Sequence, residues 1–568
     1  MKINKNAPYN QVREITDLKD MLNSSCELYA DRVAFLRKEK PGEAYKEVTY
    51  KQLKEDVDAL GTALIDLGLK DKNIVVIGEN RYEWAIAYLA IVNGVGTVVP
   101  LDKELPEAEI EGLIMRAKVS AVIYSNRKKE QIDNICKRVE TVKTCIGMDD
   151  DQKLSIKELI KKGKKLIKKD KRYIEAKIDN KKPLIILFTS GTTSQSKGVL
   201  LSHHNIAYDM MCGCKSILVD PEDRFFSVLP LHHTYECTAG FLIPLYRGAS
   251  IAHCEGLRYI AKNMQEAKPT MMLAVPAIFE NIYGKIWDNI RKQGKEKTVK
   301  TMEKLSWWLY SKIGLDIRGK VFKQIHANFG GKLRIGIVGA AAMNPDVIEG
   351  YRKLGIHMIQ GYGLTEAAPL AALNRDTYYN DKSAGREVPG IALRIDSPNE
   401  EGIGEICLKG DNIMLGYYEN EEATNETIVD GWLHTGDLGY IDNDGFLFIT
   451  GRIKSVLITK NGKNVYPEEV EAIINKSPLI KESMIYQKEN KDGDDTFIAA
   501  IIVPDFEYIK ENIGDNISED ELKNKLWEEV KIANSELVSY KHVKEIKVRK
   551  EELEKTTTLK IKRYLVEK

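Results

Sequence analysis

The segment Leu187–Val199, LFTSGTTSQSKGV, continues an apolar run that begins at Leu184 and then changes abruptly to glycine and hydroxyl residues. An apolar run bounded in this way predicts a buried strand that ends in a polar loop. Glycines let successive backbone N–H groups point into one concavity, and the hydroxyl groups add neutral donors. The loop therefore suits a phosphate group, although a polar hairpin turn is the simpler alternative for this segment alone.

The loop differs from the Walker A pattern, G-x-x-x-x-G-K-[ST], at two positions. Gly191 and Lys197 have the spacing of the pattern's first glycine and its lysine. Ser196 replaces the second glycine, and Gly198 replaces the hydroxyl residue that binds Mg²⁺. We therefore predict a phosphate loop of another class.

The composition is that of a globular protein, because 43% of the 568 residues are hydrophobic and 30% are charged. This length predicts roughly two to four domains. The 85 basic and 84 acidic residues leave a net charge of +1, so no overall field favours nucleic acid. The lysine-rich run 161–172 is interpreted as a solvated helix, with a phosphate or anionic-lipid patch as the alternative.

The cysteine pattern and the N-terminal sequence bear on the cellular compartment of the protein. The eight cysteines include no C-x-x-C pair, which favours free thiols in a reducing cytosol over zinc or a disulfide framework. The N-terminus lacks the apolar stretch of a secretory signal. The apolar span Trp84–Leu101 is interrupted by Asn93 and two glycines, and so predicts a buried helix and then a strand. We expect a cytoplasmic protein and leave peripheral membrane contact open.

Strand-like and helix-like segments alternate over the first part of the chain. The first of them are 53–67 with helical spacing, and the β-rich runs 74–77, 97–99 and 121–124. The same rhythm resumes at 184–275 and 333–373, and it predicts doubly wound sheets. Residues 280–328 are expected to form charged helices that cover one side of a sheet.

The C-terminal part has a different pattern. After Gly385 short strands alternate with glycine-rich turns, and Asp444-Gly445 between two apolar runs predicts a hairpin. We place a boundary at 452–454, between residues 1–451 and a C-terminal domain at 455–568. The predicted fold class is α/β: a large N-terminal domain of doubly wound sheets with a β-rich portion, and a small α+β C-terminal domain.

Five further segments contain residues suited to chemistry. They are LPLHHTYE (229–236), GYGLTE (361–366), HTGDLGY (434–440), GRIKSVLITKNGKNVYPEEVE (451–471) and KTTTLKIKR (555–563). Each has an ordinary alternative when taken alone. GYGLTE is compatible with a helix cap, the histidines with half-buried polar residues, and the last segment with a solvated tail.

Together and in this order, the motifs resemble those of the adenylate-forming (AMP-binding) superfamily, whose phosphate loop reads T-S-G-T-T-G-x-P-K-G. The resemblance extends over nearly the whole chain. LPLHHTYE resembles the L-P-L-x-H-x-x-E of the long-chain fatty acid–CoA ligase branch, with His233 at the motif's histidine. The resemblance implies an AMP-forming acid–thiol ligase that uses ATP, Mg²⁺ and coenzyme A, and a C-terminal domain that moves about a hinge at Lys454.

The resemblance also implies roles for individual residues. The implied ATP- and AMP-binding residues are Thr189, Ser190, Gly191, Thr192, Thr193, Lys197, Gly339, Ala340, Ala341, Tyr362, Gly363, Thr365, Asp437, Arg452 and Lys560. The loop would hold the β- and γ-phosphates, Tyr362 would stack on adenine, and Asp437 would accept from the ribose hydroxyls.

The implied catalytic group is Lys560, Thr365, Glu366 and His233. In the resemblance, Glu366 is the Mg²⁺ ligand, assisted by Thr189, because a hard cation prefers oxygen ligands. Lys560 would stabilise the negative charge that develops on the α-phosphate. The strand at Gly462, Lys463 and Asn464 would line a tunnel for the thiol of coenzyme A.

Four positions depart from the family pattern. Ser194 and Ser196 replace a glycine and a proline of the phosphate loop, and Leu559 replaces the glycine before the catalytic lysine. The extra hydroxyls add donors, whereas Leu559 changes how the lysine approaches its target. Ala277 replaces an arginine common in V-P-R-x-x-E, so no role is assigned there.

The implied reaction is activation of a fatty acid to acyl-AMP with release of pyrophosphate, and then transfer to coenzyme A. Two alternatives stay open: a ligase that loads an acyl carrier protein, and a catalytically idle homologue that keeps the nucleotide site. The expected partners are a small carboxylic acid, ATP and coenzyme A, without nucleic acid. Acyl chain length and oligomeric state are not determined by the sequence.

Overall fold

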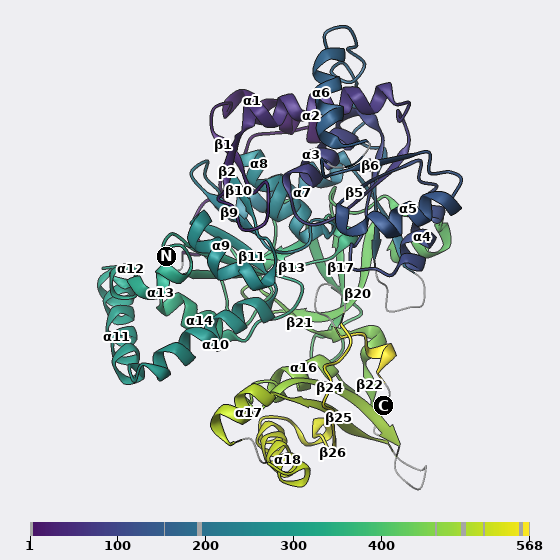
Figure 1. The fold of residues 1–568 in the computed structure, drawn as a ribbon. Coiled ribbons are helices and arrows are strands. Elements are labelled where there is room, and N and C mark those ends of the chain that lie inside the picture. The colour runs from purple at the N-terminus through teal and green to yellow at the C-terminus, as the bar shows by residue number, and fades with distance from the viewer. Residues whose placement is uncertain are drawn as a thin grey trace. The chain divides into compact units, whose positions relative to one another are not determined.

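The computed structural model describes residues 4–150, 152, 154–189, 196–459, 463–489, 496–514, 517–555 and 561–566 (Figure 1). The chain divides into two compact units. Unit 1 comprises Met1–Ala392 and Leu408–Leu433, and unit 2 comprises Leu393–Cys407 and His434–Lys568. Unit 2 thus includes residues on the N-terminal side of the expected boundary at 452–454. A division by packing does not test where the chain rotates, so the hinge at Lys454 stays a prediction.

The phosphate-loop segment lies in a seven-stranded sheet of unit 1, with the order β18-β8-β7-β4-β3-β5-β6. Its strands are β3 (Asn73–Ile77), β4 (Thr97–Pro100), β5 (Ala121–Tyr124), β6 (Thr144–Gly147), β7 (Pro183–Thr189), β8 (Lys197–Ser202) and β18 (Gly416–Tyr417). The strands from β6 to β7 are parallel, and β8 and β18 extend the sheet in antiparallel pairing.

A nine-stranded sheet forms the rest of the framework of unit 1, with the order β15-β14-β13-β12-β11-β9-β10-β1-β2. Its strands are β1 (Val33–Arg37), β2 (Lys46–Thr49), β9 (Arg224–Ser227), β10 (Ser250–His253), β11 (Met271–Ala274), β12 (Ile335–Val338), β13 (His357–Gly363), β14 (Leu370–Leu373) and β15 (Arg386–Glu387). The central strands from β1 to β13 are parallel, and β10 and β11 are buried along their full length. Strands of this kind require helices on both faces, which confirms the doubly wound architecture.

The helices of unit 1 alternate with these strands (Figure 1). They are α1 (Leu18–Leu28), α2 (Tyr50–Asp66), α3 (Tyr82–Ala90), α4 (Glu107–Arg116), α5 (Lys129–Arg138), α6 (Ile156–Leu166), α7 (His203–Ser216), α8 (Ile243–Arg247), α9 (Ile260–Ala267), α10 (Pro276–Lys292), α11 (Glu296–Trp308), α12 (Arg318–Val321), α13 (Lys323–Asn328), α14 (Pro345–Lys353) and α15 (Glu421–Thr427). The apolar span at Trp84 forms α3 and then β4, as predicted. No helix in the described part of the chain is long and apolar enough to span a membrane.

The charged segment 280–328 is helical, as predicted, and packs on the nine-stranded sheet. Trp287 of α10 and Phe329, which follows α13, belong to one buried cluster with Met272 of β11 and Met358 of β13. The cluster explains the position of these helices, because burying large apolar side chains against a sheet is the main favourable term in such packing.

Unit 2 is of the α+β class, as predicted. Its strands are β16 (Ala392–Asp396), β17 (Gly404–Lys409), β20 (Trp432–Ile441), β21 (Leu447–Arg452), β22 (Leu457–Ile458), β23 (Asn464–Val465), β24 (Ile480–Glu489), β25 (Thr496–Pro504) and β26 (Glu545–Val548), and its helices are α16 (Pro467–Ile474), α17 (Phe506–Asn512) and α18 (Glu519–Ser535). The predicted hairpin joins β20 and β21, with Gly445 at φ 81° in the turn. A left-handed residue in a tight turn is the conformation that glycine adopts without strain.

One cysteine pair differs from the expectation of free thiols. Cys136 in α5 and Cys145 in β6 are joined by a disulfide. The short connection between α5 and β6 turns the chain back and brings the two side chains together, which the spacing alone does not reveal. The other cysteines are buried free thiols: Cys26, Cys212, Cys214, Cys237, Cys254 and Cys407.

Packing of α18 should determine the stability of unit 2. Leu526 is fully buried in the core of that unit, whereas Ile532 of the same helix is 59% exposed. We expect Leu526→Ala to cost roughly 2–5 kcal/mol because it leaves a cavity, and Ile532→Ala to stay within about 0.5 kcal/mol. Amide hydrogen exchange of β25 in the full chain measures both. Equal loss of protection in the two variants would contradict this account of the core.

Candidate active site

The phosphate-loop segment begins and ends on paired strands. Thr189, the last residue of β7, lies opposite Lys197, the first residue of β8, and its hydroxyl donates to Lys197 O at 3.3 Å. The loop ends are therefore closed at the edge of a hydrogen-bonded hairpin. Four of the predicted loop residues, Ser190, Gly191, Thr192 and Thr193, lie outside the described residues.

Tyr417 connects the end of this loop with the GYGLTE motif. Lys197 Nζ lies 4.5 Å from the centroid of the Tyr417 ring. The Tyr417 hydroxyl donates to Glu366 Oε1 at 3.0 Å. Burial, and then the neighbouring Glu366 carboxylate, raise the pKa of Tyr417, so the phenol stays protonated and can donate. Tyr417, which lies in no recognised motif, thus contacts both Lys197 and Glu366, and the binding roles of these two residues stay predictions.

The motif that contains His233 also reaches GYGLTE. The hydroxyls of Thr234 and Thr365 are 3.1 Å apart, which places the residue after His233 directly beside the predicted α-phosphate ligand. The rings of His232 and His233 have their centroids 4.2 Å apart. Burial, and then Lys103, lower the pKa of His232 to about 3, so this imidazole is neutral at physiological pH. The catalytic role of His233 stays a prediction.

Small residues are required where adenine is predicted to bind. Gly339 follows β12, and a Cβ added to it would lie 2.9 Å from Tyr235 Cζ. A Cβ on Gly363 would overlap the carbonyl oxygen of Pro369. Ala340 has a φ of 72°, in the left-handed region. Packing alone therefore explains the two glycines. The contact of Gly339, Gly363, Ala340, Ala341 and Tyr362 with adenine stays a prediction.

Two buried polar residues hold the backbone next to Glu366. Asn412 Nδ2 donates to Ala367 O at 2.7 Å and to Leu370 O at 2.8 Å. Asp209 Oδ1 accepts from Leu370 N at 3.1 Å and from Asn412 Nδ2 at 3.3 Å. Burial raises the pKa of Asp209 to about 8. This pair positions the turn after β13, and the sequence analysis missed it because neither residue belongs to a recognised motif.

Unit 2 contributes a second group of predicted residues. Asp437 and Arg452 lie opposite each other on β20 and β21, and Arg452 Nε donates to Asp437 Oδ1 at 2.8 Å. Glu405 Oε1 accepts from Gly436 N at 2.9 Å, and Glu405 Oε2 lies 2.7 Å from His434 Nδ1. These contacts brace the HTGD turn before Asp437.

The brace also includes a thiol. Cys407 Sγ lies 3.5 Å from His434 Nδ1, and the ligand atoms of Glu405, Cys407 and His434 lie within 4.8 Å of one another. Burial raises the pKa of the Cys407 thiol to about 11, and both Glu405 oxygens already have partners. We therefore interpret the trio as a structural brace of the turn.

The remaining predicted residues of unit 2 are only partly described. Lys454 is exposed in a short 3₁₀ turn, Ile453–Ser455. Lys463 N donates to Thr459 Oγ1 at 3.0 Å, and Asn464 begins β23. Gly462 and the catalytic Lys560 lie outside the described residues.

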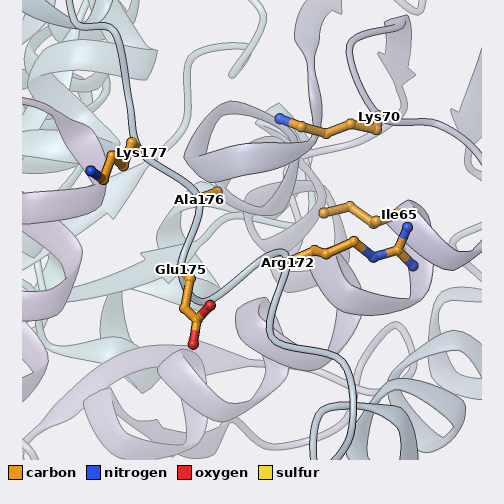
Figure 2. Close-up of a pocket in the computed structure, with 6 residues that line it drawn as sticks. All are labelled: Ile65, Lys70, Arg172, Glu175, Ala176 and Lys177. Carbon is orange, nitrogen blue, oxygen red and sulfur yellow. The ribbon is translucent and has the colours of Figure 1, made fainter.

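A cavity elsewhere in unit 1 does not resemble a binding site. It has a volume of about 460 Å³ and is lined by Ile65, Lys70, Arg172, Glu175, Ala176 and Lys177 (Figure 2). The side chains of Glu175 and Lys177 point away from Lys70 and Arg172 (Figure 2). Arg172 pairs with Asp170, and Lys70 Nζ donates to Gly94 O at 3.0 Å. Its charged groups therefore do not converge on a ligand.

Family models match most of the chain. The model of the AMP-binding enzymes matches residues 22–418, and that of the AMP-binding enzyme C-terminal domain matches residues 454–568. The chain therefore belongs to the adenylate-forming enzyme superfamily, in its acyl-CoA synthetase branch.

Curated relatives cover most of both sequences. Long-chain-fatty-acid–CoA ligase 5 of Rattus norvegicus is 30% identical over 92% of this chain and 83% of its own. Long-chain-fatty-acid–CoA ligase FadD15 of Mycobacterium bovis is 26% identical over 92% and 90%. Fatty acyl-CoA synthetase B of Dictyostelium discoideum is 29% identical over 90% and 80%.

Solved structures share the fold. The anthranilate CoA ligase AuaEII in complex with anthranoyl-AMP has a TM-score of 0.77 at 20% identity and covers 99% of this chain and 98% of its own. ATP-bound MatB from Rhodopseudomonas palustris has a TM-score of 0.75 at 23% identity, with 97% and 98% covered. These likenesses confirm the fold class of a large α/β unit followed by a smaller C-terminal one.

The described residues fit a nucleotide and its metal ion. Glu366 presents a carboxylate in which Oε1 is engaged by Tyr417, while Oε2 forms no hydrogen bond with any described residue. A free carboxylate oxygen is a ligand of the kind Mg²⁺ prefers, and the participation of the Thr189 hydroxyl stays a prediction. Lys197 adds a cation suited to phosphate.

Glu236, the last residue of LPLHHTYE, is a buried carboxyl group for which the fold provides space. It lies in a π-helical segment, Tyr235–Leu242, and is fully buried. A Cβ on Gly240 would lie 2.7 Å from Glu236 Oε2, so this glycine provides the space for the carboxyl group. Burial raises the pKa of Glu236 to about 8, so the group is mainly protonated at pH 7.

We expect Glu236 to make the stability depend on pH. The folded protein holds this proton more tightly than the unfolded chain, so the stabilisation is complete below about pH 4.5 and is lost as pH rises through about 8. Glu236→Gln removes the titration. The free energy of unfolding should therefore fall more for the wild type than for the variant between pH 6 and pH 9 in urea titrations. Identical pH dependence in both proteins would show that Glu236 is ionised in the fold.

Proposed function

We propose that the chain activates a long-chain fatty acid with ATP to give acyl-AMP and pyrophosphate, and then transfers the acyl group to coenzyme A. The observation that carries this proposal is the convergence of Lys197, Tyr417 and Glu366 beside Thr365 and Thr234. It joins three motifs far apart in the sequence: the phosphate loop, GYGLTE and LPLHHTYE. The names of the curated relatives support a fatty acid as the substrate.

The first step is an in-line displacement at phosphorus. A carboxylate oxygen of the acid attacks the α-phosphorus of ATP, the bond to the bridging oxygen breaks, and pyrophosphate leaves with the electron pair. Lys197 would hold the terminal phosphates, Thr365 would donate to the α-phosphate, and Asp437 would accept from the ribose hydroxyls beside Arg452. Mg²⁺ bound by Glu366 and Thr189 would offset charge on the leaving group.

The second step needs a thiol. Its sulfur attacks the carbonyl carbon of acyl-AMP, AMP leaves, and the thiol proton passes to solvent. The mixed anhydride makes this attack feasible, because a free carboxylate is a poor electrophile. We propose that unit 2 rotates at Lys454 between the steps, so that Lys560 serves the first and the strand at Gly462, Lys463 and Asn464 serves the second.

The proposal and its alternative differ in the acceptor of the acyl group. The acceptor is coenzyme A in the proposal, and an acyl carrier protein in the alternative. The curated relatives are named as coenzyme A ligases, which favours coenzyme A as the acceptor here. A cytoplasmic location with peripheral membrane contact stays part of the proposal.

Glu366→Ala should abolish formation of acyl-AMP, because it removes the carboxylate of the proposed Mg²⁺ site. We expect a fall in pyrophosphate release of at least about 100-fold, the effect of losing one preorganised charged group. Glu422→Ala, in the exposed first turn of α15, is the matched control and should retain wild-type rates. The assay measures pyrophosphate and AMP with a panel of carboxylic acids, with and without coenzyme A. ADP and inorganic phosphate as products would refute the adenylation mechanism.

Two lysine variants should separate the half-reactions. Lys560→Ala removes a cation from the α-phosphate, so adenylation should fall roughly 10²–10³-fold, while thioester formation from supplied acyl-AMP should hardly change. Lys454→Pro should leave adenylation unchanged and reduce thioester formation. Proline is tolerated in the first turn of a helix, so the variant should fold, but it restricts the backbone torsion that a hinge must change.

Lys454→Ala is the control for the hinge variant, since it removes the same charge without restricting the backbone. Each half-reaction is measured by rapid quench with purified acyl-AMP or with ATP and acid. Equal losses in both steps for either variant would exclude alternation of the two groups.

A further inference from the structure

An apolar surface of unit 1 is left exposed by the described residues. It consists of Met302, Leu305 and Trp308 on α11 and of Ile313 and Leu315 just after it, which are 43–59% exposed. We call these five residues the Trp308 face. Met302, Leu305 and Trp308 follow one another at intervals of three, so they form a continuous stripe along the helix.

The opposite side of α11 fixes the direction of this stripe. Ser306 is buried, and Val299 packs against the apolar cluster of α10 and the nine-stranded sheet. Arg318 Cζ lies 3.7 Å from the ring centroid of Tyr310 and 5.7 Å from that of Trp307. The helix is therefore held by its inner side, and the outward position of Trp308 follows from ordered packing.

Basic residues outnumber acidic residues in the segment that carries the stripe. The segment Lys295–Lys320 contains seven basic and three acidic residues, a net charge of +4, whereas the whole chain has a net charge of +1. Lys297, Lys304 and Lys312 are exposed and form no salt bridge with any described residue. Long lysine side chains can keep their charge in water while their stems cover apolar surface. The face is thus apolar at its centre and positively charged at its margin.

We propose that the Trp308 face docks unit 1 on an anionic lipid bilayer. Tryptophan with leucine and methionine on one side of a helix, and lysines beside them, is the composition of helices that lie in the membrane interface. Exposed lysines are attracted by the negative surface potential of such a membrane. The 13 residues of α11 are too few to span a bilayer, so the helix lies parallel to the surface.

A second copy of the chain fits this face less well. A symmetric dimer through the stripe would bring Lys304 and Lys312 near the same residues of the other copy. Like charges at such an interface repel, whereas anionic headgroups neutralise them. The charge therefore favours a lipid surface over self-association.

The benefit of membrane docking rests on the proposed function. Long-chain fatty acids partition into bilayers, so an enzyme that uses them gains from binding there. Docking through α11 would bring the enzyme to the phase that contains its substrate. Binding to vesicles needs no catalysis, so it can be measured even if the substrate assignment fails.

Co-sedimentation with vesicles tests the proposal. Wild-type protein is mixed with vesicles of equal parts phosphatidylglycerol and phosphatidylcholine, and with vesicles of phosphatidylcholine alone. We expect at least about tenfold stronger binding to the anionic vesicles, and loss of most of that preference in 0.5 M salt, because salt screens surface charges. Leu305→Ser/Trp308→Ser and, separately, Lys304→Glu/Lys312→Glu should each weaken binding at least about tenfold.

Met115→Ser/Leu257→Ser is the matched control, since both residues are exposed apolar residues of unit 1 outside the Trp308 face. It should bind like the wild type. Pyrophosphate release with a short, water-soluble acid should be equal in all variants, which separates a docking defect from a folding or catalytic one.

Three outcomes would overturn the proposal. They are absence of wild-type binding, equal binding to both kinds of vesicle, and a serine variant that binds normally but changes from dimer to monomer in analytical ultracentrifugation. The last outcome would assign the face to a second copy. Vesicle binding by a protein that releases no pyrophosphate with any fatty acid would leave the docking surface standing and remove the proposed substrate.

Discussion

The hydrogen bond from Tyr417 to Glu366 connects the two sheets of unit 1. Tyr417 belongs to β18 at the edge of the seven-stranded sheet, and Glu366 lies in the turn after β13 of the nine-stranded sheet. Lys197 Nζ lies over the phenol ring of Tyr417. A cation, a protonated phenol and a carboxylate therefore lie next to one another where the two sheets meet. Because the phenol donates to Oε1, it fixes the orientation of the Glu366 carboxylate.

The surrounding backbone is positioned in advance of any ligand. Asn412 donates to two carbonyl groups of the turn that carries Glu366, and Asp209 accepts from one of its N–H groups. Both residues are buried, so these bonds are protected from exchange with water. A turn held in this way loses little further entropy when it binds charged phosphates, which is the general advantage of preorganisation.

Each of the two units has its own core and holds its own group of predicted site residues. Unit 2 holds Asp437 by its pairing with Arg452 and by the brace of Glu405 and His434. Its apolar cluster of α16, α18 and β24–β26 is independent of the clusters of unit 1. Independent cores are what a rigid rotation requires, because neither unit must unfold when the other moves.

Local patterns in the sequence were sufficient for the fold class and for the main motifs. Alternating strands and helices predict parallel sheets, and glycine and hydroxyl residues at strand ends mark GYGLTE and the HTGD turn, because such signals depend on neighbouring residues only. Tyr417, Asp209 and Asn412 were not found, since each acts alone and meets its partners through long-range pairing. The disulfide of Cys136 and Cys145 was missed for a different reason: the turn between α5 and β6 brings the two thiols together, which their spacing alone does not reveal. The sequence thus determined which chemical groups are present in which order, and the tertiary structure decided which of them meet, because burial and strand pairing bring distant segments into contact.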